Sequence, residues 1–191
     1  MLKDERLRKL WSLAEPLLRE GRALKHTSTA LRLAEKLIKQ AGGDELVVMA
    51  AVILHDVGYA KTKLKWTQVS SGSKLPEHME EGARIARRLM EEAGFNGWVR
   101  EKVEFIVKNH DTLRGETLRG VCLNVKLALE ADRLAGWATP YGVKTVAKLE
   151  RKSPLKVLED FESQLDELLA TSVAKDMAKQ MIAELRRKIK A

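Results

Sequence analysis

The stretch of this 191-residue sequence with the clearest chemical potential is Val52 to Gly58, which contains an adjacent histidine and aspartate. An almost wholly apolar segment, 46–54, runs directly into His55 and Asp56 and is interrupted by Gly58. A helix that is apolar on every side is a buried helix, so its end lies inside the protein. Burying an unpaired charge is very costly, and a metal cation is the simplest partner for both side chains. We therefore predict a metal site at the end of this helix.

The chain has four histidines, and each lies in register with the apolar stripe of its own predicted helix. They are His26, His55, His78 and His110, and Asp132 lies similarly on a background of Leu, Val and Ala. A single buried histidine is more often a hydrogen-bonded core residue than a ligand. That explanation weakens here, because all four histidines behave alike and the sequence has none left for the surface. A shared metal site accounts for all five positions together.

The predicted ligands are four imidazoles and two carboxylates: His26, His55, Asp56, His78, His110 and Asp132. The single cysteine, Cys122, excludes an internal disulfide and a thiolate cluster. This donor set suits Fe, Mn, Co, Ni or Zn, whereas Mg²⁺ prefers oxygen ligands alone. Six ligands are too many for one catalytic ion that keeps a position open for water. We therefore predict two divalent transition-metal ions, with Asp56 as the carboxylate between them.

The elements that position these residues are predicted to be helices, because apolar residues recur at helical spacing and strand-like alternation is almost absent. Two segments lack this pattern, 58–75 and 111–120, and we predict polar loops there; the first is long enough to be functional. Residues 140–142 have the composition of a turn. The predicted helices cover about 2–19, 24–42, 45–55, 76–93, 96–110, 123–136, 143–151 and 155–189.

The length and composition fit one domain spanning residues 1–191. We expect an all-α core over about 20–136 and a C-terminal helical extension over about 137–191. The last predicted helix has no histidine and ends in basic residues, so we interpret it as a packing or association surface. Association of two copies through it, as a homodimer, is one expectation.

The charge and hydropathy of the chain restrict its location and partners. No run of 18 apolar residues occurs, so no membrane span is expected, and the charged N-terminus lacks the apolar region of a signal peptide. We therefore expect a cytoplasmic protein. The net charge of +8 favours an anionic partner. Aromatic residues make up only 5% and do not interleave with basic ones, so a small phosphorylated molecule fits better than nucleic acid.

The series His26, His55-Asp56 and Asp132 resembles the H…HD…D signature of the HD-domain superfamily of metal-dependent phosphohydrolases. Three shorter motifs agree in order. Residues 55–58, HDVG, resemble the HD-Ile-Gly turn of the family; residues 78–83, HMEEGA, resemble its His-x-x-x-Gly-Ala helix start; and residues 131–134, ADRL, match its Ala-Asp-Arg-Leu ending. The resemblance covers about residues 20–136.

This resemblance implies an all-α bundle of five or more helices around the metal site, and hydrolysis of a phosphate ester. It places His78 and His110 at the extra positions of the two-metal branch, which includes cyclic-nucleotide phosphodiesterases. Single-metal members, such as deoxynucleotide phosphatases, use equivalents of the other four ligands. Two features depart from the family pattern. The lysine that often follows HD-Ile-Gly is displaced to Lys61, and the Gly-Tyr-Pro element of the cyclic-di-GMP enzymes is missing, so that substrate is not carried over.

The leading hypothesis is therefore a phosphohydrolase acting on a nucleotide or another small phosphate ester through attack by a metal-activated hydroxide. Asp56, Lys61 and Asp111 are the candidate catalytic residues, and Lys61 and Arg133 are candidate contacts for the substrate. The other three residues also have interpretations that involve no catalysis or substrate binding. Lys61 is equally well explained as an exposed loop residue, Asp111 as a helix cap, and Arg133 as part of a surface salt bridge.

Two other function classes remain open from the sequence. The same ligands resemble those of the HD-type di-iron oxygenases, which cleave carbon–carbon or carbon–phosphorus bonds, although the short spacing from His110 to Asp132 favours a hydrolase. A non-catalytic regulatory module with a structural metal is the second alternative. The sequence leaves open the substrate, the native metal, the number of ions and the oligomeric state.

Overall fold

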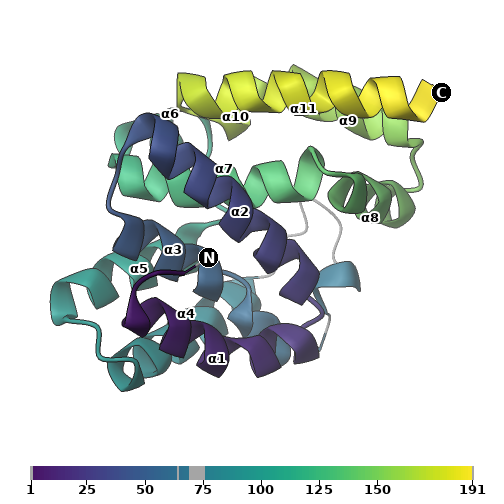
Figure 1. Cartoon of the computed structure of the whole chain (residues 1–191). Helices are drawn as coiled ribbons and strands as arrows, with labels where there is room; N and C mark the ends of the chain where they lie inside the picture. The colour runs from purple at the N-terminus through teal and green to yellow at the C-terminus, as the bar shows by residue number, and fades with distance from the viewer. Residues whose placement is uncertain (1, 64, 69–75, 191) are drawn as a thin grey trace.

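The computed structural model of the protein describes residues 2–63, 65–68 and 76–190, and in these residues it contains helices and no β-strand (Figure 1). The predicted all-α fold is confirmed. The elements are α1 (Glu5–Glu20), α2 (Leu24–Ala41), α3 (Glu45–Leu54), the 3₁₀ helices η1 (Val57–Ala60) and η2 (Trp66–Gln68), α4 (Pro76–Glu92), α5 (Gly97–Asn109), α6 (Gly115–Gly120), α7 (Leu123–Trp137), α8 (Pro140–Glu150), α9 (Pro154–Ser163), α10 (Leu165–Leu168) and α11 (Ser172–Lys190).

Helix α3 is the centre of the core. Every residue from Val47 to Leu54 is buried, as the uninterrupted apolar run predicts. The helix packs against α1, α2, α5 and α7, so it is covered on all sides (Figure 1). Its N-terminus is capped by Asp44, whose side chain accepts hydrogen bonds from the backbone N–H groups of Leu46 and Val47. The C-terminal end of α3 therefore points into the interior and places His55 and Asp56 there.

The surrounding helices α1, α2, α4, α5 and α7 follow the predicted boundaries to within a few residues. Their apolar faces pack on α3 and on one another, with α2 lying against α7 and α4 against α5. The histidine-bearing positions of these helices face the interior, since His26 and His78 are both buried. Within the described residues, no helix combines the length and the apolar character that crossing a bilayer requires.

Helices are present where two loops or turns were predicted. Residues 115–120 form α6, in which Leu118 is buried, although the segment was predicted as part of a polar loop. The predicted turn at 140–142 instead begins α8. Thr139 caps that helix by accepting a hydrogen bond from the N–H of Gly142, and Pro140 occupies the first turn, where its missing N–H is not needed. Of the predicted loop 58–75, residues 64 and 69–75 lie outside the described residues.

The last helix was predicted as one element over 155–189, and this is wrong. The segment forms α9, α10 and α11, with breaks at Gln164 and around Leu169. The second break has a tertiary cause that periodicity cannot reveal. The N–H groups of Ala170 and Thr171 donate to the carboxylate of Glu130 on α7 instead of to helical carbonyls. Helix α11 packs on α9, α7 and α2 of its own chain, and association with a second copy and the single-domain assignment stay predictions.

Two buried charged side chains on α7 attach the C-terminal helices to the core. The Glu130 carboxylate accepts two backbone N–H bonds and the hydroxyl of Thr171, each at 2.7 Å. The Arg133 guanidinium donates to the carbonyls of Leu168 at 2.7 Å, His110 at 3.3 Å and Leu113. These two residues flank Asp132, so the C-terminal segment braces the helix turn that supplies a predicted ligand.

Helix η1 approaches α4 so closely that only glycine fits at position 58. A Cβ added to Gly58 would overlap the carbonyl oxygen of His78 and lie 2.7 Å from the backbone nitrogen of Gly82. This contact holds the residues after Asp56 against the helix that bears His78. The structure thus gives a steric reason for the glycine of the HDVG sequence.

We expect Gly58→Ala to lower the free energy of unfolding by about 3 kcal/mol, because the added methyl group must separate η1 from α4. Denaturant unfolding of the wild type and the variant measures this difference. Gly97→Ala is the matched control, since a Cβ at Gly97 meets nothing within 4 Å. Equal stability of both variants would show that the approach of η1 to α4 is not required.

We also expect Arg133→Met to lower the free energy of unfolding by about 3 kcal/mol, since it removes a buried guanidinium and leaves three carbonyls without their donor. Arg88→Met, at an exposed position of α4, is the control. If Arg133 instead acts mainly on the substrate, stability will be retained and the KM for the substrate will rise.

Candidate metal centre

The six predicted ligands come from five helical segments and meet in the interior of the bundle. His26 lies on α2, His78 on α4 and Asp132 on α7, while His55 and Asp56 follow α3 and His110 follows α5. The four histidines are each no more than 3% exposed. The interior position that periodicity predicts for these histidines is therefore confirmed, whereas their role as ligands stays a prediction.

The first group of donor atoms surrounds one oxygen of Asp56. His55 Nε2 lies 3.2 Å and His26 Nε2 3.7 Å from Asp56 Oδ2. Asp132 Oδ1 lies 2.8 Å from His26 Nε2 and 3.5 Å from His55 Nε2. Ligand atoms about 2.1 Å from a transition-metal ion stand about 3 Å apart when neighbouring bonds are perpendicular. These four atoms are therefore spaced as neighbouring ligands of one ion would be.

The second group surrounds the other oxygen of Asp56. His110 Nε2 lies 3.7 Å from Asp56 Oδ1 and 3.2 Å from His78 Nε2. Asp111 belongs to this group as well, because its Oδ2 lies 3.3 Å from His78 Nε2 and its Oδ1 3.9 Å from His110 Nε2. The two oxygens of Asp56 thus face two different sets of imidazoles, as a bridging carboxylate requires.

The hydrogen bonding of His55 and His110 fixes which nitrogen of these two rings faces the centre. His55 Nδ1 lies 2.7 Å from the carbonyl of Val52, and His110 Nδ1 lies 2.8 Å from the carbonyl of Val107. A carbonyl oxygen can only accept, so each Nδ1 is protonated and donates. Each Nε2 is then free to act as a ligand, which is the usual outer arrangement of metal-binding histidines.

Two buried atoms of the predicted ligands His55 and Asp56 lack a hydrogen-bond partner in the described part of the chain. Among the described residues, His55 Nε2 and Asp56 Oδ2 have no hydrogen-bond partner although both are inaccessible to solvent. Leaving such groups unpaired costs about 1–3 kcal/mol each, and more when they are charged. A cation coordinated by both atoms removes that cost, so the residues fit a divalent metal.

The electrostatics of the centre are those of closely opposed imidazoles and carboxylates. Burial alone would raise the pKa of Asp56, but the imidazoles of His55, His110 and His26 outweigh it and hold this pKa far below its usual range. Asp132 behaves similarly, with His55 and His26 lowering its pKa against the effect of burial. Burial would lower the pKa of His55, and the carboxylates of Asp56 and Asp132 raise it well above its ordinary value. The carboxylates are therefore ionised at neutral pH.

The remaining predicted site residues lie in different surroundings. The Asp111 side chain is 46% exposed at the edge of the second group, where His110 and His78 lower its pKa although burial opposes them. Lys61 directly follows η1 and its side chain is exposed, so its contact with a phosphate stays a prediction. Arg133 is buried and bonded to three carbonyls, which excludes the predicted surface salt bridge. That geometry favours a structural role, and its contact with substrate stays a prediction.

Sequence reasoning missed two aromatic residues beside the centre. The ring of Tyr59 is stacked on His78 with centroids 4.3 Å apart and an angle of 11° between the planes. The indole of Trp66 is stacked on His26, with centroids 4.5 Å apart and planes at 24°. Both residues lie in the segment 58–75, where the lack of helical periodicity gives no prediction of which side chains face the interior. Their aromatic character within a loop of suspected function was the one signal that pointed to them.

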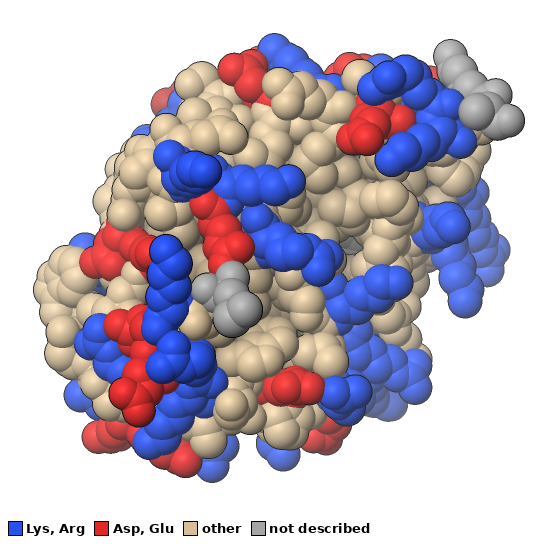
Figure 2. Space-filling view, in the orientation of Figure 1, with Lys and Arg blue, Asp and Glu red and all other residues tan. Residues whose placement is uncertain are grey.

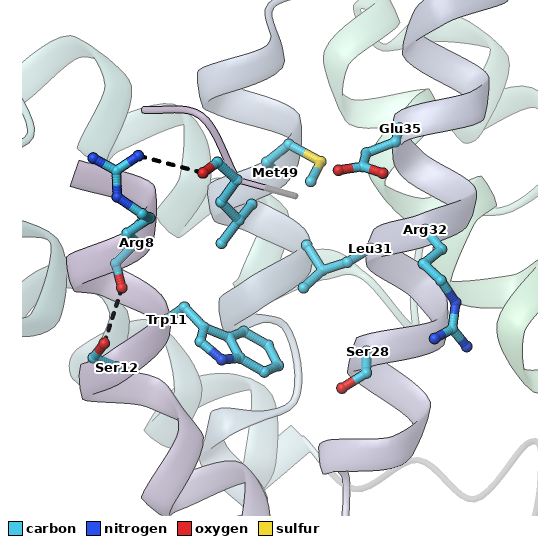
Figure 3. A pocket seen from close by; sticks show the side chains of 9 residues that line it. Arg8, Trp11, Ser12, Ser28, Leu31, Arg32, Glu35 and Met49 are labelled. Atoms are coloured by element: carbon cyan, nitrogen blue, oxygen red, sulfur yellow. Dashed lines mark hydrogen bonds between the residues drawn. The ribbon is translucent and has the colours of Figure 1, made fainter. Parts of the chain in front are cut away.

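A cavity of about 470 Å³ lies elsewhere, between α1, α2 and α3 (Figure 3). Its walls include Trp11, Leu31 and Met49, and the charged side chains of Arg8 and Arg32 belong to its lining. None of its lining residues is one of the clustered histidines or aspartates. This cavity is therefore separate from the candidate metal centre.

One comparison with known proteins gives a match. The family model described as HD domain matches residues 23–137, which include all six predicted ligands. No curated protein and no solved structure matches the chain. The matched range is close to the range of the resemblance noted in the sequence, about 20–136.

We expect the stability of the metal-free protein to fall as the pH rises from about 6.5 towards 9. Burial would lower the pKa of His110, but Asp111 and Asp56 raise it to about 9. A raised folded-state pKa stabilises the protein below the unfolded value near 6.5, and this contribution is lost as pH rises through 9. Metal binding must displace the same proton, so the stabilisation by added Zn²⁺ should grow over that range. Unfolding temperatures with chelator and with Zn²⁺, at pH 6.5 and 9, measure both trends.

The matched variant is His110→Gln, which should reduce the pH dependence of the metal-free protein and leave the part that is due to His55, whose pKa is also raised. A metal-free wild type of constant stability between pH 6.5 and 9 would contradict the raised pKa of His110.

Proposed function

This chain belongs to the HD domain family, and from that premise we propose that it is a metal-dependent phosphohydrolase of a nucleotide or another small phosphate ester. The observation that supports this most directly is the position of Asp56, whose two oxygens face two separate sets of imidazoles. A carboxylate between two cations is the arrangement that two-metal hydrolysis of phosphate esters uses.

The donor set divides into two groups that share Asp56. His26, His55, Asp56 and Asp132 would hold one divalent ion, and Asp56, His78 and His110 would hold the second. The mixture of imidazole and carboxylate suits Fe, Mn, Ni, Co or Zn. When bound, such ions supply positive charge for the phosphoryl oxygens and make water acidic enough to act as a nucleophile near neutral pH.

The residues of the chain orient and isolate this centre. The Nδ1 bonds of His55 and His110 to backbone carbonyls fix their rings, so that little reorganisation is needed when charge develops. The stacked rings of Tyr59 and Trp66 cover His78 and His26 and limit the access of water to them. Asp111, partly exposed beside His78, is placed to hold or accept a proton at the edge of the centre.

The substrate we infer is small and anionic. The net charge of +8 favours a phosphorylated molecule, and the exposed Lys61 near the end of η1 is our candidate for an additional contact with its phosphate. The donor atoms lie within the bundle among buried residues, where a single phosphate group fits more readily than a nucleic acid duplex.

We expect about two metal ions per chain in the wild type, about one in His78→Ala and substantially fewer in Asp56→Ala, because Asp56 belongs to both groups of ligands. Hydrolysis of phosphate esters should fall about a hundredfold or more in Asp56→Ala. Elemental analysis of protein purified without added metal or a His tag, followed by a screen of phosphate esters, measures both quantities.

Asp176→Ala, at an exposed position of α11, is the matched control and should retain full metal content and activity. Full activity of Asp56→Ala would contradict the proposed role. Substrate-dependent oxygen uptake that requires Fe would instead establish an oxygenase, and metal binding without turnover of any ester would establish a regulatory module.

A further inference from the structure

Two nearly parallel aromatic rings lie beside the first group of ligands. Trp66, in η2, is stacked on His26, and the ring of Tyr141, in α8, lies 6.0 Å from Trp66 with 15° between the planes. We propose that Trp66 and Tyr141 recognise the aromatic base of a nucleotide whose phosphate is held at the metal centre, and that Lys25 beside them attracts the phosphate. This inference rests on the proposed function and names the substrate class through residues outside the ligand set.

Trp66 is held in place by hydrogen bonds of its own backbone and of the neighbouring Lys65. Part of its ring is accessible. Its N–H donates to the carbonyl of Gly21 at 3.0 Å. The ammonium group of Lys65 donates to the carbonyls of Tyr59, Ala60 and Thr62 at 3.1–3.2 Å and so ties the segment before Trp66 to the end of η1. The indole is only partly buried, although the imidazole on which it stacks is buried. In the proposed complex, the accessible part of the indole is the surface that meets the base.

Tyr141 is supplied by the C-terminal helices rather than by the HD core. It lies outside residues 23–137, at the start of α8, and α8 is in contact with η2. Its ring, like that of Trp66, is partly buried. The family match therefore covers the predicted metal ligands and Trp66 but excludes Tyr141. The pair of Trp66 and Tyr141 forms only because the C-terminal helices pack on the HD core.

Positive charge accompanies the aromatic pair. The ammonium group of Lys25 lies 4.3 Å from the centre of the Tyr141 ring, and Lys25 directly precedes His26 on α2. Lys and Arg side chains gather along the edge of the molecule between α8 and the end of α1, with few acidic side chains among them (Figure 2). Rings that stack on a base, beside cations that attract phosphate, are the combination that binds nucleotides with little dependence on the identity of the base.

The test compares two probes that differ only in the base. They are the phosphonate analogues of AMP and of ribose 5-phosphate, in which a CH₂ group replaces the bridging ester oxygen and prevents hydrolysis. The protein is loaded with Zn²⁺, which has no redox chemistry. We expect the wild type to bind the AMP analogue about tenfold or more tightly than the ribose analogue, as measured by titration calorimetry.

Trp66→Leu and Tyr141→Leu should each reduce this preference to about threefold or less. Tyr141→Leu, which leaves the indole on His26 in place, should keep the zinc content and the affinity for the ribose analogue unchanged. Trp66→Phe retains a stacking surface and should keep most of the preference. Lys25→Met should weaken the binding of both analogues alike. Trp98→Leu is the matched control, because Trp98 is an exposed indole with Lys102 4.4 Å from its ring and lies at the opposite end of α5 from His110.

The outcomes separate this inference from the proposed function. Equal affinity of the zinc-loaded wild type for the two analogues would overturn base recognition and leave phosphate-ester hydrolysis standing. Failure of the wild type to bind metal would overturn the proposed function itself. If Trp66→Leu loses zinc and its affinity for both analogues falls equally, the indole serves only to hold His26 in position. That result would also overturn base recognition.

Discussion

The structure of this protein depends on one buried carboxylate. Asp56 is 3% exposed and ionised, and its two oxygens face imidazoles that come from four different segments of the chain. A buried charge is tolerated only when it is paired, and within the described part of the chain Asp56 Oδ2 and His55 Nε2 have no hydrogen-bond partner. The centre of the bundle therefore contains a group of buried side chains that could hold a divalent cation, in place of the apolar packing that would otherwise fill it.

Holding such a centre requires a rigid scaffold, because ligands from separate helices must meet within a few tenths of an ångström. Helix α3 is enclosed by other helices and delivers His55 and Asp56 from a fixed direction. Close contact at Gly58 sets the distance to the helix bearing His78. Bonds from Glu130 and Arg133 brace the turn of α7 that bears Asp132. Three of the five helices that bear predicted ligands are thus fixed by a contact near the ligand.

The C-terminal helices act on the centre from two directions, although they lie largely beyond the region that matches the HD domain family. Their segment 168–171 is hydrogen-bonded to α7, since it donates to Glu130 and accepts from Arg133, and α8 brings Tyr141 beside Trp66. The predicted metal ligands belong to the family core, whereas one ring of the proposed recognition surface comes from outside it. On the proposed function, the HD core would carry out the hydrolysis and the C-terminal helices would help to select which phosphate ester is bound.

The sequence by itself determined the helical fold, the burial of α3 and the interior position of the four histidines, because helix periodicity is a local property of neighbouring residues. It also singled out Asp56 as the central carboxylate, from its place after an apolar helix. The tertiary structure alone decided which oxygen of Asp56 faces which histidines, that Arg133 bonds to backbone carbonyls, and that the last predicted helix breaks near Leu169. It also revealed Trp66 and Tyr141 as neighbours. Apart from the adjacent pair His55 and Asp56, those features arise from contacts between residues 20 to 75 positions apart, and no periodic pattern in the chain encodes the distance between them.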